Sequence, residues 1–212
     1  MKKILTGCLL LLSLTSANSQ ILSGRAAEQV NANAIELRYD ARSNAPLYVE
    51  FKANSFISAS AGMEGLNSIL GATTNDDWRI IRRDRDDLGI NHVRYQQYYK
   101  NVKVITGEYI LHENQGRVVA ANGMFFDHLT LNTAPAINEK QALNAALNNI
   151  HASKYLWQCS EAEQRILSGG IATNAAPQGE LVVLPSLNGD RKQGINLCWQ
   201  FDVYATQPHE RW

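Results

Sequence analysis

The sequence predicts an α+β protein of two small modules, each an antiparallel β-sheet packed with helix. Three observations predict this class. Residues 87–126 hold three β-rich runs joined by short turns, as in an antiparallel meander. Residues 138–150 carry apolar side chains at helical spacing, and residues 195–204 alternate between apolar and polar side chains like a half-buried strand.

The first 19 residues have the features of a signal peptide. A positive start (Lys2 and Lys3) is followed by an apolar run over residues 4–14, and small side chains lead up to Ser19 and Gln20. A membrane anchor is the alternative, but about 11 apolar residues are too few for a bilayer that needs roughly 20. We expect cleavage between Ser19 and Gln20, a periplasmic or secreted product, and no stable membrane association afterwards.

Composition and charge are those of an ordinary globular protein. The 20 Lys and Arg residues balance 20 Asp and Glu residues, so loss of Lys2 and Lys3 with the leader leaves a net charge of about −2. The arginines within residues 79–85 are interleaved with aspartates. This pattern indicates a solvated, self-neutralising strand face, and it does not favour nucleic acid as a partner.

Two cysteines, Cys159 and Cys198, remain after cleavage. In an oxidising compartment, a bridge closing their loop of about 40 residues would contribute roughly 3–4 kcal/mol. Two unpaired thiols are the alternative. Spacing alone does not place the two Cα atoms within bonding range, so both possibilities stay open.

Before the meander, the chain predicts short elements. Residues 20–33 are polar and Ala-rich, and we expect poor order at their start. Residues 35–39 and 47–51 predict strands, the first with its odd-numbered apolar side chains on one face. Residues 56–70 predict a short helix interrupted by glycines. Residues 73–77 predict a turn, since they lack the Asp/Asn spacing of a calcium loop.

The meander itself begins with a strand over residues 92–99. Asn101 interrupts it, a second β-prone run follows to His112, and residues 113–116 predict a turn before a third run that ends at Phe126. The first strand would place Val93, Tyr95, Gln97 and Tyr99 on one face and His92, Arg94, Gln96 and Tyr98 on the other.

This stretch, roughly residues 78–126, resembles the fungalysin/thermolysin propeptide (FTP) domain, which has an H-x-R-x-x-Q run, a turn, an apolar V-x-V and a closing turn with Gly. The family usually has Gly where this chain has Asn101 and often Pro where it has Lys103. Asn readily adopts positive φ, so the first departure fits the same turn. The matching residues are His92, Arg94, Gln97, Tyr98, Asn101, Val102, Val104 and Gly107.

His92 and Arg94 have two interpretations within this resemblance. They could form an interdomain or inhibitory contact. They could instead lie on a strand face that hydrogen-bonds a neighbouring loop inside the propeptide, and we favour this second interpretation.

The second module starts after a Pro-bearing linker at residues 130–136. Asn138 and Gln141 form a capping-box pattern at the start of the helix. The helix resembles the start of a PepSY-like module, and the strands at residues 180–185 and 195–204 resemble the end of pro-regions in thermolysin-like proteases. The last strand has a wide apolar face, so we expect the module to be truncated at its C-terminal end. Its Trp199 and Phe201 are core residues or part of a surface that docks on a protease.

The resemblance implies a signal peptide (1–19), an FTP-like propeptide domain (20–132) and a PepSY-like domain (133–212). The chain would be the pro-region of a secreted thermolysin-like zinc metalloprotease, an intramolecular chaperone and inhibitor whose partner is the cognate catalytic domain. Neither H-E-x-x-H nor G-x-S-x-G occurs. We therefore expect no enzyme and no cofactor here, with zinc in the implied protease domain. The alternative is a free-standing binding module or trans-acting protease inhibitor.

Overall fold

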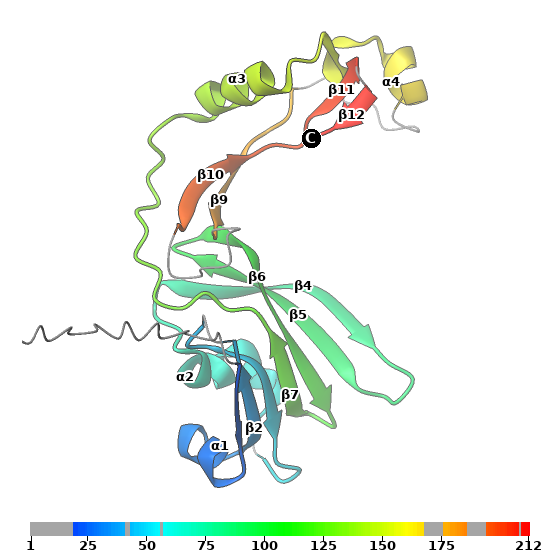
Figure 1. Ribbon diagram of the computed structural model, residues 1–212. Coiled ribbons are helices and arrows are strands. Elements are labelled where there is room, and N and C mark those ends of the chain that lie inside the picture. The colour runs from blue at the N-terminus through cyan, green and yellow to red at the C-terminus, as the bar shows by residue number, and fades with distance from the viewer. Residues whose placement is uncertain (1–18, 41–42, 56, 168–175, 186–193, 208) are drawn as a thin grey trace, which may run out of the picture.

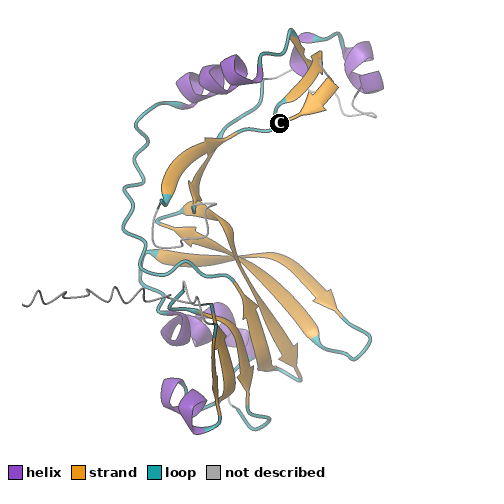
Figure 2. Ribbon diagram, in the orientation of Figure 1, coloured by secondary structure: helices purple, strands orange, loops and turns teal. Residues whose placement is uncertain are grey.

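A computed structural model describes residues 19–40, 43–55, 57–167, 176–185, 194–207 and 209–212. The predicted signal peptide lies almost wholly outside the described residues. Figures 1 and 2 show a lower body built on a large sheet and an upper lobe, joined by an extended linker and a β-hairpin. Within the described residues no helix is long and apolar enough to cross a membrane.

The elements confirm the α+β class. In the large sheet the order is β1 (Gln20–Ser23), β2 (Ala34–Tyr39), β3 (Pro46–Phe51), β7 (Arg117–Gly123), β6 (Val102–Asn114), β5 (Asn91–Tyr99) and β4 (Asp76–Arg85), with β9 (Glu180–Leu184) on β6 and β10 (Asn196–Gln200) on β9. The small sheet has the order β12 (His209–Arg211), β11 (Tyr204–Gln207), β8 (Lys154–Tyr155). The helices are α1 (Arg25–Val30), α2 (Asn67–Leu70), α3 (Glu139–Ile150) and α4 (Glu161–Leu167), with 3₁₀ segments η1 (Ala59–Leu66) and η2 (Leu156–Gln158).

The predicted meander is confirmed as β5, β6 and β7, with β4 added at its edge. Two-residue turns join the strands. Lys100 and Asn101 have φ of 47° and 66°, and Gln115 and Gly116 have φ of 50° and 79°. Positive φ at both central residues is the turn geometry that matches the twist of paired strands. Asn101 therefore has the positive φ that was predicted for this turn.

β6 is paired on one side with two different strands. Its second half pairs with β7, from Tyr109 to Asn114, whereas Lys103 and Val104 pair in parallel with Val182 and Val183 of β9. The changeover falls at an irregularity between β5 and β6. Thus the sheets are antiparallel except at the ladder of β6 with β9, and the two predicted modules share that ladder.

The main core lies under the large sheet, and it corrects two expectations. β1 is a strand paired with β2 from Gln20 to Ser23, and Ala27 of α1 is fully buried, so the expected poor order there is wrong. In β2 the register shifts after Ala34, which places Ile35 at 39% exposure while Ala34 and Leu37 are buried. The alternation of apolar and polar residues in a short stretch of sequence shows neither which strands pair nor where a bulge falls.

The segment between β3 and β4 contains the interrupted helix and the turn that its sequence predicts. Residues 59–70 form η1 and α2, interrupted at Gly62, which has φ of 57°. The following turn is closed by Asp76, whose carboxylate accepts hydrogen bonds from the backbone N–H and the hydroxyl of Thr73 at 2.9 and 2.8 Å. These are the contacts of an ordinary side-chain-capped turn.

The predicted capping box of α3 is confirmed. Asn138 Oδ1 accepts from the Gln141 N–H at 2.9 Å, and Gln141 Oε1 accepts from the Asn138 N–H at 3.0 Å. The strand predicted over residues 195–204 is corrected, because β10 ends at Gln200. Val203 then exchanges backbone hydrogen bonds with Trp212 beside the small sheet. The segment at residues 195–204, which was predicted to be one strand, is thus divided between the two sheets.

Candidate functional site

His92 and His112 lie opposite each other on β5 and β6, on the sheet face away from the main core. Their Nδ1 atoms are 2.6 Å apart. His92 Nε2 lies 3.1 Å from the Asp86 carboxylate in the β4–β5 turn, and His112 Nε2 lies 2.5 Å from Asn122 Oδ1 on β7. Asp86 also accepts from the backbone N–H groups of Leu88 and Ile90, and these hydrogen bonds, Ile90 first, lower the pKa of its carboxyl group.

Arg94 lies on the same face and donates to Glu108 at 2.8 Å, with both side chains more than a third exposed. Its contact is therefore with a neighbouring strand of the meander, β6. Tyr98 stacks under the Arg79 guanidinium at 3.8 Å, and Arg79 donates to Asn101 Oδ1 at 3.1 Å. Through these contacts the turn after β5 is tied to β4.

Gln97 is fully buried and holds the end of the meander in place. Its Nε2 donates to the Phe126 carbonyl at 2.9 Å and to Asp76 at 3.1 Å, and its Oε1 accepts from the Phe126 N–H at 3.0 Å. A Cβ on Gly107 would lie 2.8 Å from Gln97 Oε1, so any side chain there would displace the Gln97 amide from its hydrogen bonds. The motif Gln and Gly thus share one structural role.

Gln96 is a residue that the sequence reasoning missed. It is buried, and its Nε2 donates to the Val104 and Gly107 carbonyls at 2.7 and 2.9 Å. These bonds hold β6 where it bulges, beside Thr106, a non-Gly residue with φ of 63°. The signal available in the sequence was a pair of adjacent Gln residues within an otherwise β-prone run.

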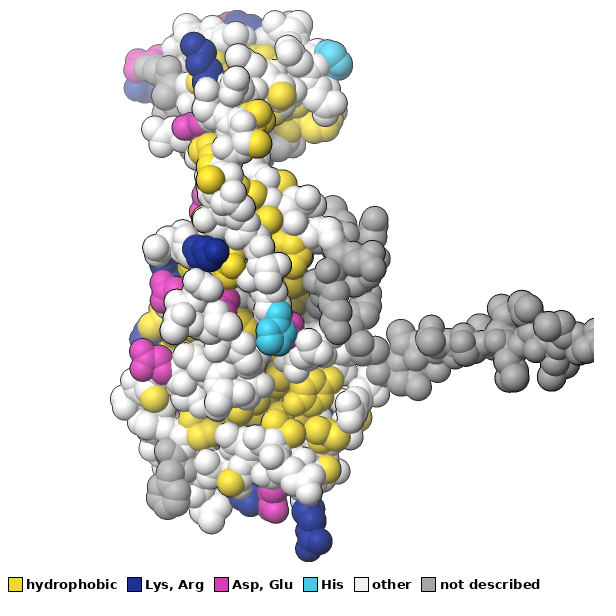
Figure 3. All heavy atoms as spheres, turned by 90° about the vertical axis from the view of Figure 1, so that its left-hand side faces the viewer, with side chains coloured by type: hydrophobic (Ala, Val, Ile, Leu, Met, Phe, Trp, Pro, Cys, Tyr) yellow, Lys and Arg dark blue, Asp and Glu magenta, His cyan; other side chains and the backbone are white. Residues whose placement is uncertain are grey.

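Val102 and Val104 lie in a second core that joins the two halves of the chain. This core contains Tyr99, Phe126, Leu129 and Val183, with Leu181 and Leu197 of the β9–β10 hairpin packed against it. The linker after β7 therefore packs on the hairpin. Figure 3 shows hydrophobic side chains along this narrow waist between the lower body and the upper lobe.

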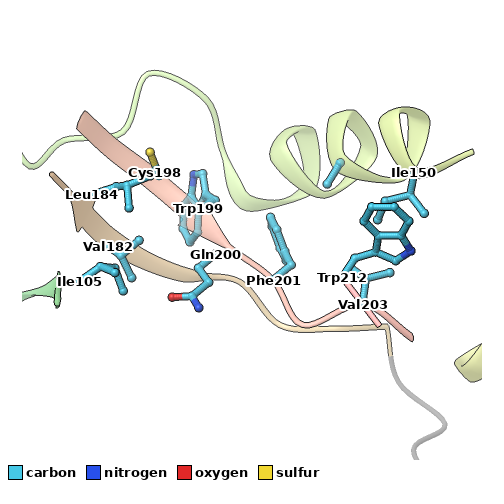
Figure 4. Close-up of a pocket in the computed structure, with 11 residues that line it drawn as sticks. Ile105, Ile150, Val182, Leu184, Cys198, Trp199, Gln200, Phe201, Val203 and Trp212 are labelled. Atoms are coloured by element: carbon cyan, nitrogen blue, oxygen red, sulfur yellow. The ribbon is translucent and has the colours of Figure 1, made fainter. Parts of the chain in front are cut away.

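A groove of about 380 Å³ lies between α3 and the β9–β10 hairpin. Figure 4 shows Trp199 of β10 beside the linker that leads into α3, Phe201 beneath the start of α3, and Trp212 beside Ile150. Trp199 donates its indole N–H to the Ile137 carbonyl at 3.0 Å. The two predicted aromatic residues are thus half-buried against the linker and α3, while they also line the groove.

Cys159 and Cys198 are both free thiols in the structure, Cys159 buried and Cys198 half-buried on the groove. Of the two alternatives, a disulfide or two unpaired thiols, the structure has the unpaired thiols. In the described part of the chain, no group of three or more His, Cys, Asp or Glu side chains converges as a metal site would.

A comparison with known protein families finds a match within the sheet described above. Residues 76–125 match the Fungalysin/Thermolysin Propeptide Motif. This propeptide motif covers β4 to β7 and the first residue of the buried Phe125–Phe126 pair, close to the predicted 78–126. A motif of this kind is a non-catalytic part of a protease precursor and fits a protease pro-region. No curated protein matches the chain.

Proposed function

We propose that this chain is the pro-region of an exported, thermolysin-like zinc metalloprotease, and that it assists folding of the protease domain and inhibits it. The propeptide motif on β4–β7 carries the proposal. Its His, Arg, Gln and Gly positions all make defined contacts within one sheet, so the motif forms a folded unit in this chain.

A folded sheet of this kind supports both roles physically. Long-range strand pairing is slow because loop closure must precede the contacts that reward it, and a preformed surface can stabilise the partner's transition state for folding. The same complex inhibits while it lasts, since a covered cleft excludes substrate. Zinc belongs to the partner in this proposal, because the chain offers no position for the family's zinc ligands.

The proposal includes export through a signal peptide at residues 1–19 and a PepSY-like module at residues 133–212. β1 begins at Gln20, directly after the predicted cleavage point, and pairs with β2. A cut there leaves the whole first strand with the mature chain.

Titration of the purified chain against a thermolysin-like zinc protease tests the proposal. We expect dose-dependent inhibition of peptide hydrolysis, with no inhibition of a subtilisin-type serine protease at equal concentration. We also expect a higher yield of active enzyme when the denatured protease is diluted into buffer containing the chain. Failure of both effects would contradict the pro-region proposal, and inhibition without improved refolding would favour the trans-acting inhibitor.

The Arg94→Ala variant tests whether the outward face of the motif belongs to the contact, with Arg38→Ala as the matched control. Arg38 is an exposed arginine paired with a carboxylate, Glu36 on β2, and lies outside the motif. Because Arg94 pairs with Glu108 inside the meander, we expect both variants to inhibit like the parent chain. Selective loss of inhibition by Arg94→Ala would assign Arg94 to the protease contact.

A further inference from the structure

The ring nitrogens of His92 and His112 make three hydrogen bonds, and each of these bonds needs one proton. Asp86 is a carboxylate and only accepts, so His92 Nε2 carries a proton. Asn122 presents Oδ1, which also only accepts, so His112 Nε2 carries a second proton. The bond between the two Nδ1 atoms, 2.6 Å apart, holds a third. Two neutral imidazoles bring only two protons, so the pair in this geometry carries one positive charge.

The carboxylate of Asp86 balances that charge. Its pKa is lowered, first by the hydrogen bond from the Ile90 N–H and also by His92, so it stays ionised in mild acid. The His92 and Asp86 side chains are 28% and 33% exposed, so water reaches them and exchanges protons with the pair. One hydrogen-bonded chain therefore runs from the β4–β5 turn through β5 and β6 to β7.

A fourth proton has no place in this chain of hydrogen bonds. It would occupy the remaining Nδ1 lone pair, so two N–H donors would face each other across the 2.6 Å contact. Both rings would then be cations, with ring centroids 4.9 Å apart in the same geometry. Histidine gains its charge between about pH 8 and 5, so mild acid supplies this proton. The two rings must separate to accept it.

Removal of a proton, in contrast, keeps all three hydrogen bonds. The neutral pair retains the proton on His92 Nε2 and the one between the Nδ1 atoms, which leaves His112 Nε2 as an acceptor. A half-turn of the Asn122 amide then presents its NH₂ group to that nitrogen. Asn122 therefore suits both states, and the contact is lost on the acid side alone.

The charged side chains around the pair do not offset a second positive charge. Two ion pairs on the same face use up their own charges, and on the other side of His112 the uncharged Ala120 separates it from the next carboxylate. These groups are Asp84 with Arg82 on β4, Arg94 of β5 with Glu108 of β6, and Glu50 on β3, while Glu113 lies near Arg83 on the core side. Asp86 is the carboxylate that contacts the pair, and the first charge already matches it.

We propose that His92 and His112 form a proton-operated clamp, in which one shared proton holds β5 to β6 near neutral pH and a further proton, taken from water in acid, opens the contact. The unfolded chain then binds one proton more than the clamped chain, so the clamp's contribution to stability is lost as the pH falls. Opening loosens the sheet of the propeptide motif where β5, β6 and β7 meet the β4–β5 turn. The clamp needs no protease, so its failure would leave the pro-region proposal untouched.

Nuclear magnetic resonance of the parent chain tests the proton count. Long-range ¹H–¹⁵N spectra, recorded between about pH 8 and 4.5, follow the ring nitrogens of His92 and His112. We expect a first protonation and then a second at least about one pH unit lower, because the charged ring opposes the second charge. Amide exchange around both histidines should accelerate at the second step, while β2 and β3 stay protected.

His92→Gln, His112→Gln and the double variant give a thermodynamic cycle of unfolding constants in urea. At about pH 7 the two changes should be coupled by about fivefold, as expected for one hydrogen bond, and the coupling should vanish or change sign at about pH 5. Glu113 is present in all four chains, so its own titration cancels. His128→Gln, at an exposed histidine outside the strands, should keep the pH dependence of the parent.

Two results would overturn the clamp. One is a pair of rings that take up their protons independently, with the same midpoint. The other is a coupling between the two histidines that is equal at about pH 7 and about pH 5. The first result comes from the parent chain, so it decides the question even where a histidine variant fails to fold.

Discussion

Glu113 is an ionisable side chain on the core side of β6, where only 8% of the residue is exposed. Burial raises the pKa of its carboxyl group, and the nearby Arg83 opposes part of that rise. A group whose pKa is raised by folding stabilises the fold fully below its unfolded pKa. That contribution is lost as the pH rises through the folded pKa. Glu113 therefore makes the fold less stable at neutral pH than at mildly acidic pH.

Glu113→Gln removes this ionisation. We expect the variant to have a higher free energy of unfolding than the parent chain at about pH 7.5, and we expect the difference to shrink toward about pH 4. Urea denaturation at several pH values measures it. Glu64→Gln, at an exposed residue of η1, should track the parent at every pH. A Glu113→Gln variant that is equally destabilised at all pH values would refute the burial argument.

Gln97→Leu should destabilise the chain by about 2–4 kcal/mol. The change leaves the buried N–H and carbonyl of Phe126 without their side-chain partner, and unsatisfied buried groups cost roughly 1–3 kcal/mol each. Urea unfolding, followed by tryptophan fluorescence, measures the loss. Gln29→Leu, on the exposed side of α1, should stay within about 0.5 kcal/mol of the parent. A small effect of Gln97→Leu would mean that another group replaces its hydrogen bonds.

Among the elements, α3 has the start most clearly specified by its own sequence. Asn138→Ala removes the side-chain half of the capping box, in which Oδ1 accepts from the Gln141 N–H, and should lower stability by about 1 kcal/mol. Because α3 lies in the upper lobe, amide exchange should accelerate in the first turn of α3 and stay unchanged in β5 and β6. Asn148→Ala, at an exposed position inside the same helix, is the control and should be neutral or slightly stabilising. Equal effects of the two changes would argue against the cap.

Elements whose conformation is determined by residues close together in the sequence were predictable. The alternation in β5, the Asn101 turn and the α3 cap are all set within a few residues. The strand state of β1 was not predictable, because it comes from pairing with β2 and not from its own polar composition. The burial of Gln96 was not predictable, because it depends on the β6 bulge, where its side chain meets the carbonyls of Val104 and Gly107.

The same limit applied to the candidate site. His92 was singled out from the motif, but its partners His112, Asp86 and Asn122 come from three other places in the chain. Strand register brought them together, and a local pattern does not give register.

At the scale of the whole molecule, the second core is what holds the upper lobe to the lower body. Val183 is fully buried there and pairs with Val104. Val183→Asp places a carboxylate in that core, so the β9–β10 hairpin should detach while the main core remains folded. Limited proteolysis should then cut faster in the linker at residues 127–138, which packs on the hairpin.

Ile166→Asp is the control for that experiment, since Ile166 is 81% exposed on α4. It should leave the rate of linker cleavage unchanged. Global unfolding of Val183→Asp, seen as complete digestion, would show that the two cores form one cooperative unit.

The divided pairing of β6 has a consequence for the order of events during synthesis and export. Lys103 and Val104 pair with Val182 and Val183, which are synthesised almost eighty residues later, whereas β5 and β7 are the neighbours of β6 in the sequence. Until β9 emerges, the first half of β6 presents unpaired N–H and C=O groups along an apolar stretch. Exposed strand edges of this kind recruit other chains. The interval before β9 arrives is therefore when this polypeptide is most prone to aggregate, and when a chaperone would protect it best.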